Sequence, residues 1–443
     1  MQIQLSEHFT YKKLIRFTLP TIFMMIFTSI YGVVDGIFVS NIVGSDSFAA
    51  VNLITPVLMI MASVGFMFGT GGSALVSKVL GEGDKKRANQ YFSMLTYILL
   101  VLGVIFTVVG MFFMRPVATL LGAKGNILED CVTYGSILML SMIPFLLQHY
   151  FQSFLIVAEK PKMGLVVSLC AGITNIILDF LFVYAFRWGL IGAAVATAIS
   201  ECIGGIVPLT FFIVSKDSPL KLRKAKLDGK AVFQTCTNGS SEMLTHISLS
   251  AVNMLYNMQL MKYIGSDGVV AYGIIMYVSF AFISAFLGYS IGSSPIVSYH
   301  YGANNTDELK NLFKKSLIIL ISSSVALTIL AELSAKLLAG IFVSYDPNLL
   351  ALTTRAIRIY SISFVMAGFN IYASAFFTAL NNGVVSAIIS FLRTLVFEVL
   401  AILILPAILG IDGIWFAVVV SGTFSTIIST IFLVANRKKY NYV

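Results

Sequence analysis

The sequence is poor in charged residues. They make up 11% of the 443 residues, against roughly 25% in an ordinary soluble domain. Hydrophobic residues make up 58%, and the mean hydropathy is +0.91. A soluble chain of this length needs a polar surface that these residues cannot supply. The composition therefore excludes a soluble enzyme, a disordered protein and a secreted disulfide scaffold, and it predicts an all-α protein that crosses a membrane many times.

Cysteine is also scarce. Cys131, Cys170, Cys202 and Cys236 lie far apart in the sequence, so they form neither a CxxC pair nor a set with metal-ligand spacing. We expect them to pack as small apolar side chains within helices. The sequence also lacks the HExxH and GxSxG patterns of hydrolases and the glycine-rich loop of nucleotide-binding proteins. An enzyme and an ATP-driven pump are therefore disfavoured.

Apolar stretches recur along the whole chain. At about 37 residues for a span and its loop, 443 residues accommodate about twelve spans, since one span needs about 20 residues. The first stretch is too long for a cleaved signal peptide and contains Asp35. The stretches are residues 14–40, 48–78, 89–114, 129–158, 163–186 and 189–214, followed by 234–262, 269–300, 313–336, 349–380, 384–408 and 411–435.

The positions of the basic residues predict the orientation. With twelve spans, 21 of the 29 Lys and Arg residues fall on the side of the N-terminus, and 7 fall on the other side. Arg393 lies within a span. This bias is what the positive-inside rule predicts for a chain with both termini in the cytoplasm. Topology thus accounts for the net charge of +9, and no nucleic-acid partner is expected.

The two halves of the sequence align at a constant shift of 221 residues. The Gly44-Ser45-Asp46 segment corresponds to Gly265-Ser266-Asp267. Identities at one shift along most of the chain indicate a duplicated unit. The other matches are Gly71, Ser73, Val76, Ser77, Gly81 and Phe92 with Gly292, Ser294, Val297, Ser298, Gly302 and Phe313; Ser153 and Ala158 with Ser374 and Ala379; and Gly189, Gly192, Ala196 and Ser200 with Gly410, Gly413, Ala417 and Ser421.

The duplication predicts two six-helix bundles. Six spans is an even number, so both units enter the membrane from the same side, and their pseudo-two-fold axis runs along the membrane normal. We expect an N-terminal lobe at residues 1–214, a basic cytoplasmic linker at 215–232 and a C-terminal lobe at 233–443. Two similar bundles that face each other suit alternating access, in which one bundle rocks against the other around a central cavity.

Four polar side chains in the first half lie at similar depths. Asp35 is in the first span, Asn175 and Asp179 are one turn apart in the fifth, and Thr197 is in the sixth. Charged groups at bilayer depth are costly and usually mark a functional site. Carboxylate, amide and hydroxyl oxygens suit a hard cation such as Na⁺, and two neighbouring carboxylates can also share a proton. The sequence does not distinguish Na⁺ from H⁺.

The second half serves as a control for this interpretation. At the 221-residue shift, the four positions become Tyr256, Val396, Leu400 and Val418. A purely structural cluster would be expected in both copies of the unit. The difference favours a cation site in the first half alone.

Other polar groups inside the spans are open to two interpretations. His149 and Gln152 lie one turn apart in the fourth span and are candidates to contact a substrate in the cavity, or to bond to a neighbouring helix. The remaining groups have roles that the sequence does not fix. They are Glu201, Glu242, His246, Arg393 and Glu398.

The pattern as a whole resembles the multidrug and toxic compound extrusion (MATE) family, and in particular its MepA-like bacterial branch. The resemblance rests on twelve spans in two repeats, on the Tyr31-Gly-Val-Val-Asp35 segment, on Gly-Glu-Gly-Asp after the second span, and on Asn175-xxx-Asp179. It covers essentially the whole chain. It implies a V-shaped, two-lobe protein in a bacterial plasma membrane that exports organic, cationic drugs or metabolites by antiport with Na⁺ or H⁺.

The resemblance also implies roles for individual residues. The cation site of the family falls on Asp35, Asn175, Asp179 and Thr197. Its first-lobe substrate cavity falls on Tyr31, His149 and Gln152; asparagine is common there in the family, so His149 is a departure that adds a titrating group. We expect no cofactor beyond the coupling ion and no other metal. The expected partners are a small organic substrate and the lipid bilayer, with the chain acting as a monomer.

Two other functions compete with export as interpretations of the sequence. A flippase for lipid-linked saccharides, from the same wider superfamily, needs several Arg or Lys residues in its cavity to hold pyrophosphate. Arg393 is the single basic residue well inside a predicted span, which argues against a flippase. An intramembrane enzyme needs a catalytic constellation, and the sequence supplies none of the usual motifs.

Overall fold

The computed structural model describes residues 3–215 and 218–443, with the side chains at 33, 35–37, 40, 41 and 45 outside the description. In the described ranges all regular structure is helical. The elements are α1 (Tyr11–Phe38), η1 (Val39–Val43), α2 (Ser45–Gly81), α3 (Lys85–Leu120), α4 (Gly125–Leu140), α5 (Met142–Val157), α6 (Pro161–Asp179), η2 (Phe180–Ala185), α7 (Gly189–Val214), α8 (Gly229–Tyr263), α9 (Ser266–Gly302), α10 (Thr306–Val343), α11 (Pro347–Ser361), α12 (Phe364–Ala379), α13 (Gly383–Phe391), η3 (Leu392–Val396), α14 (Phe397–Leu409) and α15 (Ile411–Tyr440).

Each of the twelve predicted spans corresponds to a helix or to consecutive helical segments. Within the described ranges, nine helices are long and apolar enough to cross a membrane, and two bent pairs raise that number to eleven. The pairs are α4 with α5, bent by 59°, and α11 with α12, bent by 46°. The remaining predicted span corresponds to α8, which has 35 residues and is not among these eleven. The predicted all-α, two-bundle class is confirmed.

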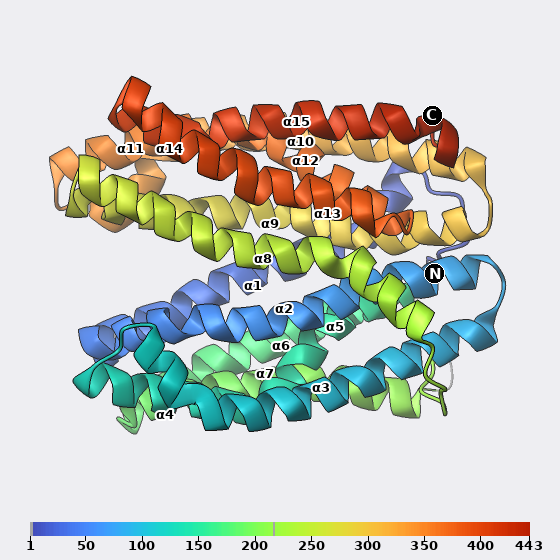
Figure 1. Cartoon of the computed structure of the whole chain (residues 1–443), viewed down its shortest axis with the longest axis horizontal. Coiled ribbons are helices and arrows are strands. Elements are labelled where there is room, and N and C mark those ends of the chain that lie inside the picture. Colours follow the sequence, from blue (N-terminus) through green and yellow to red (C-terminus); the bar gives the residue numbers. More distant parts are fainter. Residues whose placement is uncertain (1–2, 216–217) are drawn as a thin grey trace.

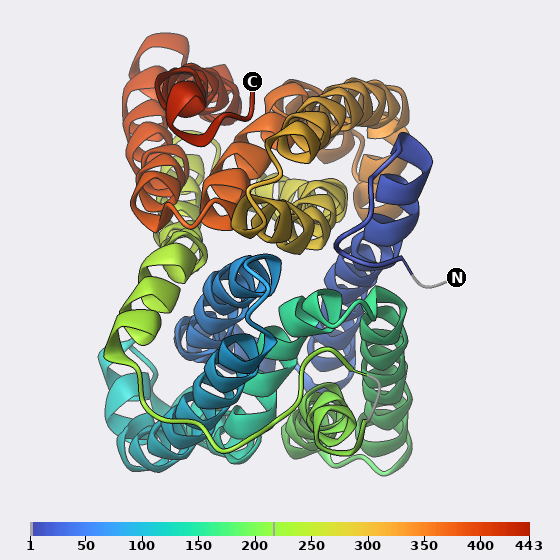
Figure 2. The same cartoon turned by 90° about the vertical axis from the view of Figure 1, so that its right-hand side faces the viewer.

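Two bundles lie side by side with their helices roughly parallel to the long axis (Figure 1). Elements α2–α7 form one bundle and α9–α15 the other, while α1 and α8 lie where the two bundles meet (Figures 1 and 2). Both chain ends lie at one end of the molecule. We call it the basic end, because segments 3–10 and 218–228 and the C-terminal Arg437–Lys439 run lie there.

Polar side chains fix where several helices begin. The first N–H groups of a helix have no partner within it, so Asp and Asn are favoured at the residue before it. Asp84 accepts from the Arg87 N–H at the start of α3, and Asn305 accepts from the Glu308 N–H at the start of α10. These two caps are 221 residues apart, so the repeat is preserved at the level of helix termini.

The first turns of α1 and α8 pack against the opposite half of the chain. Leu14 and Phe17 of α1 belong to a buried cluster that otherwise consists largely of residues from α9, α10 and α12. Ala231 of α8 belongs to the cluster of the first half. The two halves therefore exchange the beginnings of their first helices. The lobe boundaries predicted from the chain order stay a prediction.

Small residues allow the two halves to approach closely near the basic end. A Cβ atom on Gly71 of α2 would meet the carbonyl oxygen of Thr235 in α8, and a Cβ on Gly239 would meet that of Met67. The equivalent contact joins α9 to α1, where a Cβ on Gly292 would lie 3.3 Å from Thr18. Gly71 and Gly292 are repeat counterparts, as are Thr18 and Gly239. One contact thus occurs twice, around the pseudo-two-fold axis.

The N-terminal segment 3–10 joins both halves at the basic end. The Leu5 N–H donates to Glu159 Oε1, 2.9 Å away in the turn between α5 and α6, and burial raises the pKa of this carboxyl. The Phe9 N–H donates to Glu308 Oε1 in α10 at 2.8 Å, and Lys315 Nζ donates to the Phe9 carbonyl at 2.7 Å. Leu5 and Phe9 are buried. The segment therefore acts as a strap across the basic end.

The strap predicts the effect of Glu308→Ala. This change leaves the buried Phe9 N–H without its acceptor, which costs about 1–3 kcal/mol. Hydrogen exchange of the residue 3–10 peptide, measured by mass spectrometry, is therefore expected to accelerate about 5- to 150-fold. Asp307→Ala, at the exposed neighbouring position, is the control and should leave the exchange unchanged. Equal acceleration in both variants would show that Glu308 does not hold the strap.

Candidate functional site

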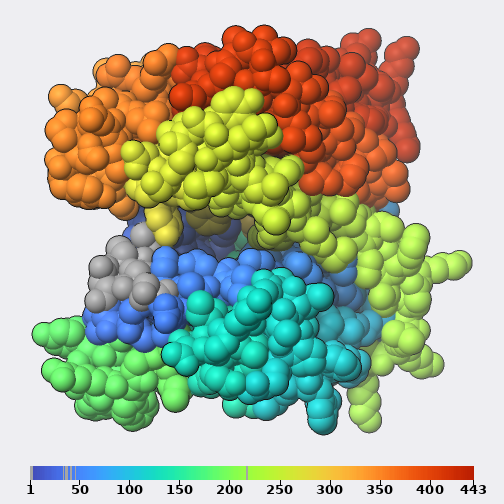
Figure 3. Space-filling view, turned by 60° about the vertical axis from the view of Figure 1, so that its left-hand side comes forward, coloured from blue at the N-terminus to red at the C-terminus, as the bar shows by residue number. Residues whose placement is uncertain are grey.

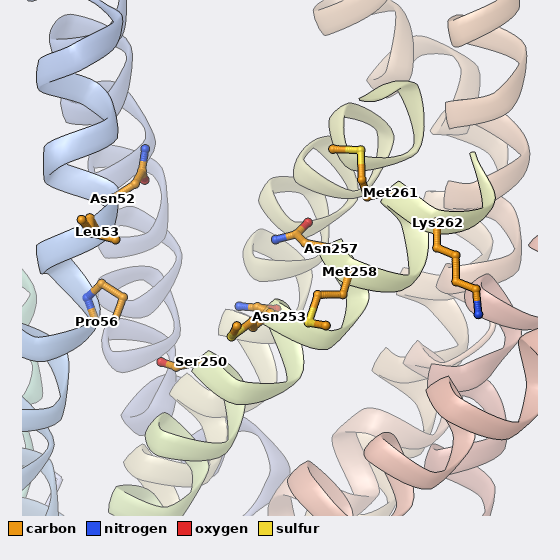
Figure 4. A pocket seen from close by; sticks show the side chains of 10 residues that line it. Asn52, Leu53, Pro56, Ser250, Asn253, Asn257, Met258, Met261 and Lys262 are labelled. Carbon is orange, nitrogen blue, oxygen red and sulfur yellow. The ribbon is translucent and has the colours of Figure 1, made fainter. Parts of the chain in front are cut away.

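A deep cleft separates the two bundles at the end opposite the basic end. Its volume is about 1010 Å³, and it is visible between α2 and α8 (Figure 3). Asn52, Leu53 and Pro56 of α2 form one wall, and residues of α8 face them across the gap (Figure 4). The α8 residues of the lining are Ser250, Asn253, Met254, Asn257, Met258, Met261 and Lys262.

The α8 wall combines amides with thioethers. Positions 250, 254, 257, 258 and 261 recur at helical spacing and so present one face of the helix. Met254, Met258 and Met261 are more than half exposed. Methionine side chains adapt to ligands of different shape, and amides offer both donors and acceptors. In the described lining the single charged side chain is Lys262. This wall is suited to flat or irregular organic molecules.

A stack of three rings lies below the cleft. The Phe66 ring of α2 is sandwiched between His149 of α5, with centroids 3.9 Å apart, and His246 of α8, with centroids 4.7 Å apart. His246 is one turn from Ser250 in the lining, on the side of the basic end. The stack connects the two halves of the chain between the cleft and the close glycine contacts. We call this stack the floor of the cleft.

The three predicted substrate residues do not belong to the described lining of the cleft. His149 and Gln152 are buried on α5, 8% and 7% exposed, and His149 takes part in the floor of the cleft. Tyr31 is half-buried on α1, with its ring 5.9 Å from that of Phe27. A substrate role for these three residues stays a prediction.

Three of the four predicted cation-site residues have described side chains. Asn175 and Asp179 are one turn apart on α6 and almost fully buried. Asn175 Nδ2 lies 3.5 Å from Thr197 Oγ1 on α7, so these two residues meet as the sequence suggests. Asp35 lies within α1, which packs against α6, but its side chain is outside the described part. A shared cation site therefore stays a prediction.

Both predicted carboxylates come shortly before a stretch of π-helix. Asp179 is the last residue of α6, and η2 begins at Phe180. Asp35 is four residues before η1, which begins at Val39. Short π-helical turns are rare and occur frequently at functional sites. The local backbone is thus unusual at the two positions where the sequence predicts function.

Several polar groups with unassigned roles have partners. Ser141 Oγ donates to Glu201 Oε2 at 2.5 Å, at the bend between α4 and α5. In the second half, Tyr256 OH donates to Glu398 Oε1 at 2.6 Å. Glu398 therefore belongs to a polar network that includes α8.

Sequence reasoning missed most of the cleft lining. The available signal was the spacing of Met254, Met258 and Met261 and of Asn253 and Asn257, which places amides and thioethers on neighbouring faces of the most polar predicted span. It also missed the ring stack, since Phe66, His149 and His246 are distant in sequence and no local pattern connects them.

Comparisons with known proteins agree with this architecture. The MatE family model matches residues 20–181 and 243–403, one stretch in each half. The multidrug export protein MepA of Staphylococcus haemolyticus is 24% identical over 444 residues, covering 98% of this chain and 95% of that protein. MepA of Staphylococcus saprophyticus is 23% identical, covering 93% of this chain and 91% of that protein.

Solved structures share the fold. A crystal structure of a MATE protein in complex with MaL6 superimposes with a TM-score of 0.93 at 22% identity, covering 98% of both chains. An outward-facing multidrug resistance MATE transporter superimposes with a TM-score of 0.91 at 22% identity, covering 98% of this chain and 97% of the other. With the family model matched in both halves, the conclusion is that this chain belongs to the MatE family, as a MepA-like MATE transporter.

Proposed function

We propose that this chain exports organic compounds across a bacterial plasma membrane in exchange for Na⁺ or H⁺. The observation that carries the proposal is the combination of a cleft between two related bundles, closed at one end by the paired glycine contacts and open at the other. A transporter of this architecture moves its substrate by alternating which end is open. The names of the MepA relatives support a multidrug substrate range.

The direction of transport follows from the charge distribution. The strap, the linker and the C-terminus place most Lys and Arg residues at the basic end. The positive-inside rule assigns that end to the cytoplasm. The cleft then faces outward, which is the state that releases an exported compound. Substrate enters from the cytoplasm after the glycine contacts and the ring stack separate.

Energy for export comes from the cation site in this proposal. Asp179, Asn175 and Thr197 supply oxygen atoms from two adjacent helices, and Asp35 adds a carboxylate from α1. Both Na⁺ and H⁺ are compatible with such a site. Coupling requires that the cation favours one conformation of the bundles and the substrate the other. Helix α1 can transmit this preference because it packs against both α6 and α9.

Neutralising Asp35 tests the coupling. We expect Asp35→Asn to remove coupled export because a single neutral amide cannot replace the charge that the cation or proton balances. Ethidium efflux from proteoliposomes is measured under a Na⁺ gradient at fixed pH and, separately, under a pH gradient without Na⁺. The initial rate of the variant should fall to that of protein-free liposomes, while the wild type should respond to one gradient and so identify the coupling ion.

Asp46→Asn provides the matched control. Asp46 is an exposed carboxylate in the same half of the chain, and its replacement should leave efflux at the wild-type rate. Wild-type efflux by Asp35→Asn would overturn the site assignment. If the wild type transports ethidium under neither gradient, the proposal of cation-coupled dye export fails.

The charge of Lys262 predicts how strongly the cleft binds cations. Lys262→Glu changes a positive charge of the lining to a negative one and should favour a cationic dye. Across solvent, the change in the interaction energy between the dye and this charge is about 0.4–1 kcal/mol. We therefore expect KM for ethidium to decrease about two- to fivefold at low salt and less at high salt. Lys336→Glu, at an exposed position of α10, should leave KM unchanged. Equal effects of both changes would point to the overall charge rather than the cleft.

A further inference from the structure

The strap, residues 3–10, is attached to the bundle of α9–α15 by several contacts with α10. The Phe9 N–H donates to Glu308 Oε1 at 2.8 Å, and the His8 ring contacts Glu308 through its Nδ1 atom. The Phe9 carbonyl accepts from Asn311 Nδ2 at 3.0 Å and from Lys315 Nζ at 2.7 Å. Phe9 is fully buried in the cluster that α9, α10 and α12 largely form. This end of the strap is therefore held firmly on α10.

The attachment of the strap to the bundle of α2–α7 is smaller. Within the described residues, the hydrogen bond that joins them runs from the Leu5 N–H to Glu159 Oε1 at 2.9 Å. Leu5 is 2% exposed, so water has little access to replace this acceptor. Glu159 lies in the turn between α5 and α6, and the N-terminal segment lies where the two bundles meet (Figure 2). One carboxylate thus holds the strap against the bundle of α2–α7.

The backbone of Glu159 has a conformation that is unfavourable for glutamate. Its φ is +60°, in the left-handed region that glycine and asparagine favour. The turn between α12 and α13, in the corresponding place of the second half, has Asn381 in this region with φ +57°. Residues held in such conformations cluster at sites where the strain serves a function. Here the strained position carries the carboxylate that accepts from the strap.

The strap lies beside a place where the backbones of the two halves touch. The His300 ring of α9 is packed edge-on against the Phe9 ring, with centroids 6.5 Å apart. At the residue before it, the Tyr299 carbonyl oxygen would overlap a Cβ atom added to Gly81 of α2. Alternating access requires such contacts at the basic end to separate. The strap is bonded to both sides of the place where this separation occurs.

Separation of the bundles requires the strap to release one attachment. Four residues join the Leu5 N–H to the Phe9 N–H, and a fully extended chain of that length spans at most about 14 Å. The strap therefore limits how far the basic end opens while both attachments hold. Phe9 has several bonds to α10, and the strap continues into α1, whose Leu14 and Phe17 pack in the same cluster. The bond to Glu159 is the one that breaks first.

We propose that the strap is a latch for the basic end, with a fixed attachment on α10 and a releasable attachment at Glu159. The latch rests on the proposed function, because a closure must be releasable only if the basic end opens during transport. Each opening breaks the hydrogen bond from Leu5 to Glu159, and each closing forms it again. The strength of this bond therefore helps to set the fraction of molecules whose basic end is open.

Chemical labelling of a cysteine between the two halves measures this fraction. Ser77→Cys in α2 is the reporter. Ser77 is fully buried, and in the described part of the chain its hydroxyl has no hydrogen-bond partner, so a thiol replaces it at little cost. Positions 74, 77 and 81 share one face of the helix, and Ala74 and Gly81 contact the second half. The rate of modification by a water-soluble maleimide is measured by peptide mass spectrometry on the full-length protein in nanodiscs.

Glu159→Gly, added to the reporter protein, releases the latch. Glycine favours the left-handed backbone of this turn, so the change removes the carboxylate without straining the chain. Leaving a buried N–H without its acceptor is worth a factor of about 5 to 150 in an equilibrium, so labelling at position 77 should accelerate at least about fivefold. Glu159→Gln keeps an acceptor oxygen and should label close to the parent rate. Asp307→Ala removes an exposed carboxylate at the basic end and should match the parent.

Native Cys131 reports on unfolding in the same experiment. It is fully buried in the bundle of α2–α7, so its labelling should stay slow in every variant. Acceleration by Glu159→Gly at position 77 alone supports the latch. An unchanged rate at position 77, equal acceleration in Asp307→Ala, or equal acceleration at Cys131 would overturn it. The measurement uses neither substrate nor an ion gradient, so the ethidium efflux experiment decides the proposed export separately.

Discussion

The close approach of helix backbones at the basic end is the contact on which the rest of the structure depends. Gly71 meets α8 and Gly292 meets α1; a Cβ atom added at Gly71 would overlap the Thr235 carbonyl, and one added at Gly292 would lie in tight contact with Thr18, 3.3 Å away. The bundles touch at this end. At the opposite end α2 and α8 lie farther apart, and the cleft lies between them. Contacts made by glycine backbones involve little interlocking of side chains. They can therefore separate without large repacking, as the proposed alternating access requires.

The duplicated architecture constrains the two halves to the same helix geometry but not to the same chemistry. The glycine contacts and the Asp84 and Asn305 caps are preserved between the repeats. The space beside Gly172 holds aromatic rings in the first half, and its counterpart holds Arg393. Backbone packing is conserved because both halves must meet around one axis. The interior of each bundle is free to diverge, so ionisable groups differ.

The fold was largely predictable from the sequence, and the site only in part. Apolar length determines where helices cross a membrane, so each predicted span corresponds to helical segments, although α8 is not among the eleven candidate spans of the described ranges. The meeting of Asn175 with Thr197 was also predicted, since depth along a helix follows from residue count. The π-helical turns after Asp35 and Asp179 were not predicted, because they depend on packing between helices. The substrate role of His149 stays a prediction. Its stacking on Phe66 was not predictable, because hydropathy does not report which neighbour a buried polar ring faces.

In the proposed coupling, helix α1 connects the cation site with one of the closing contacts. Asp35 is 17 positions from Thr18, which contacts Gly292, so the two positions lie about 25 Å apart along the helix. Reversing a strongly biased two-state equilibrium takes roughly 5.5 kcal/mol of differential binding. In this proposal the cation supplies that preference through α1, because the helix packs against both α6 and α9.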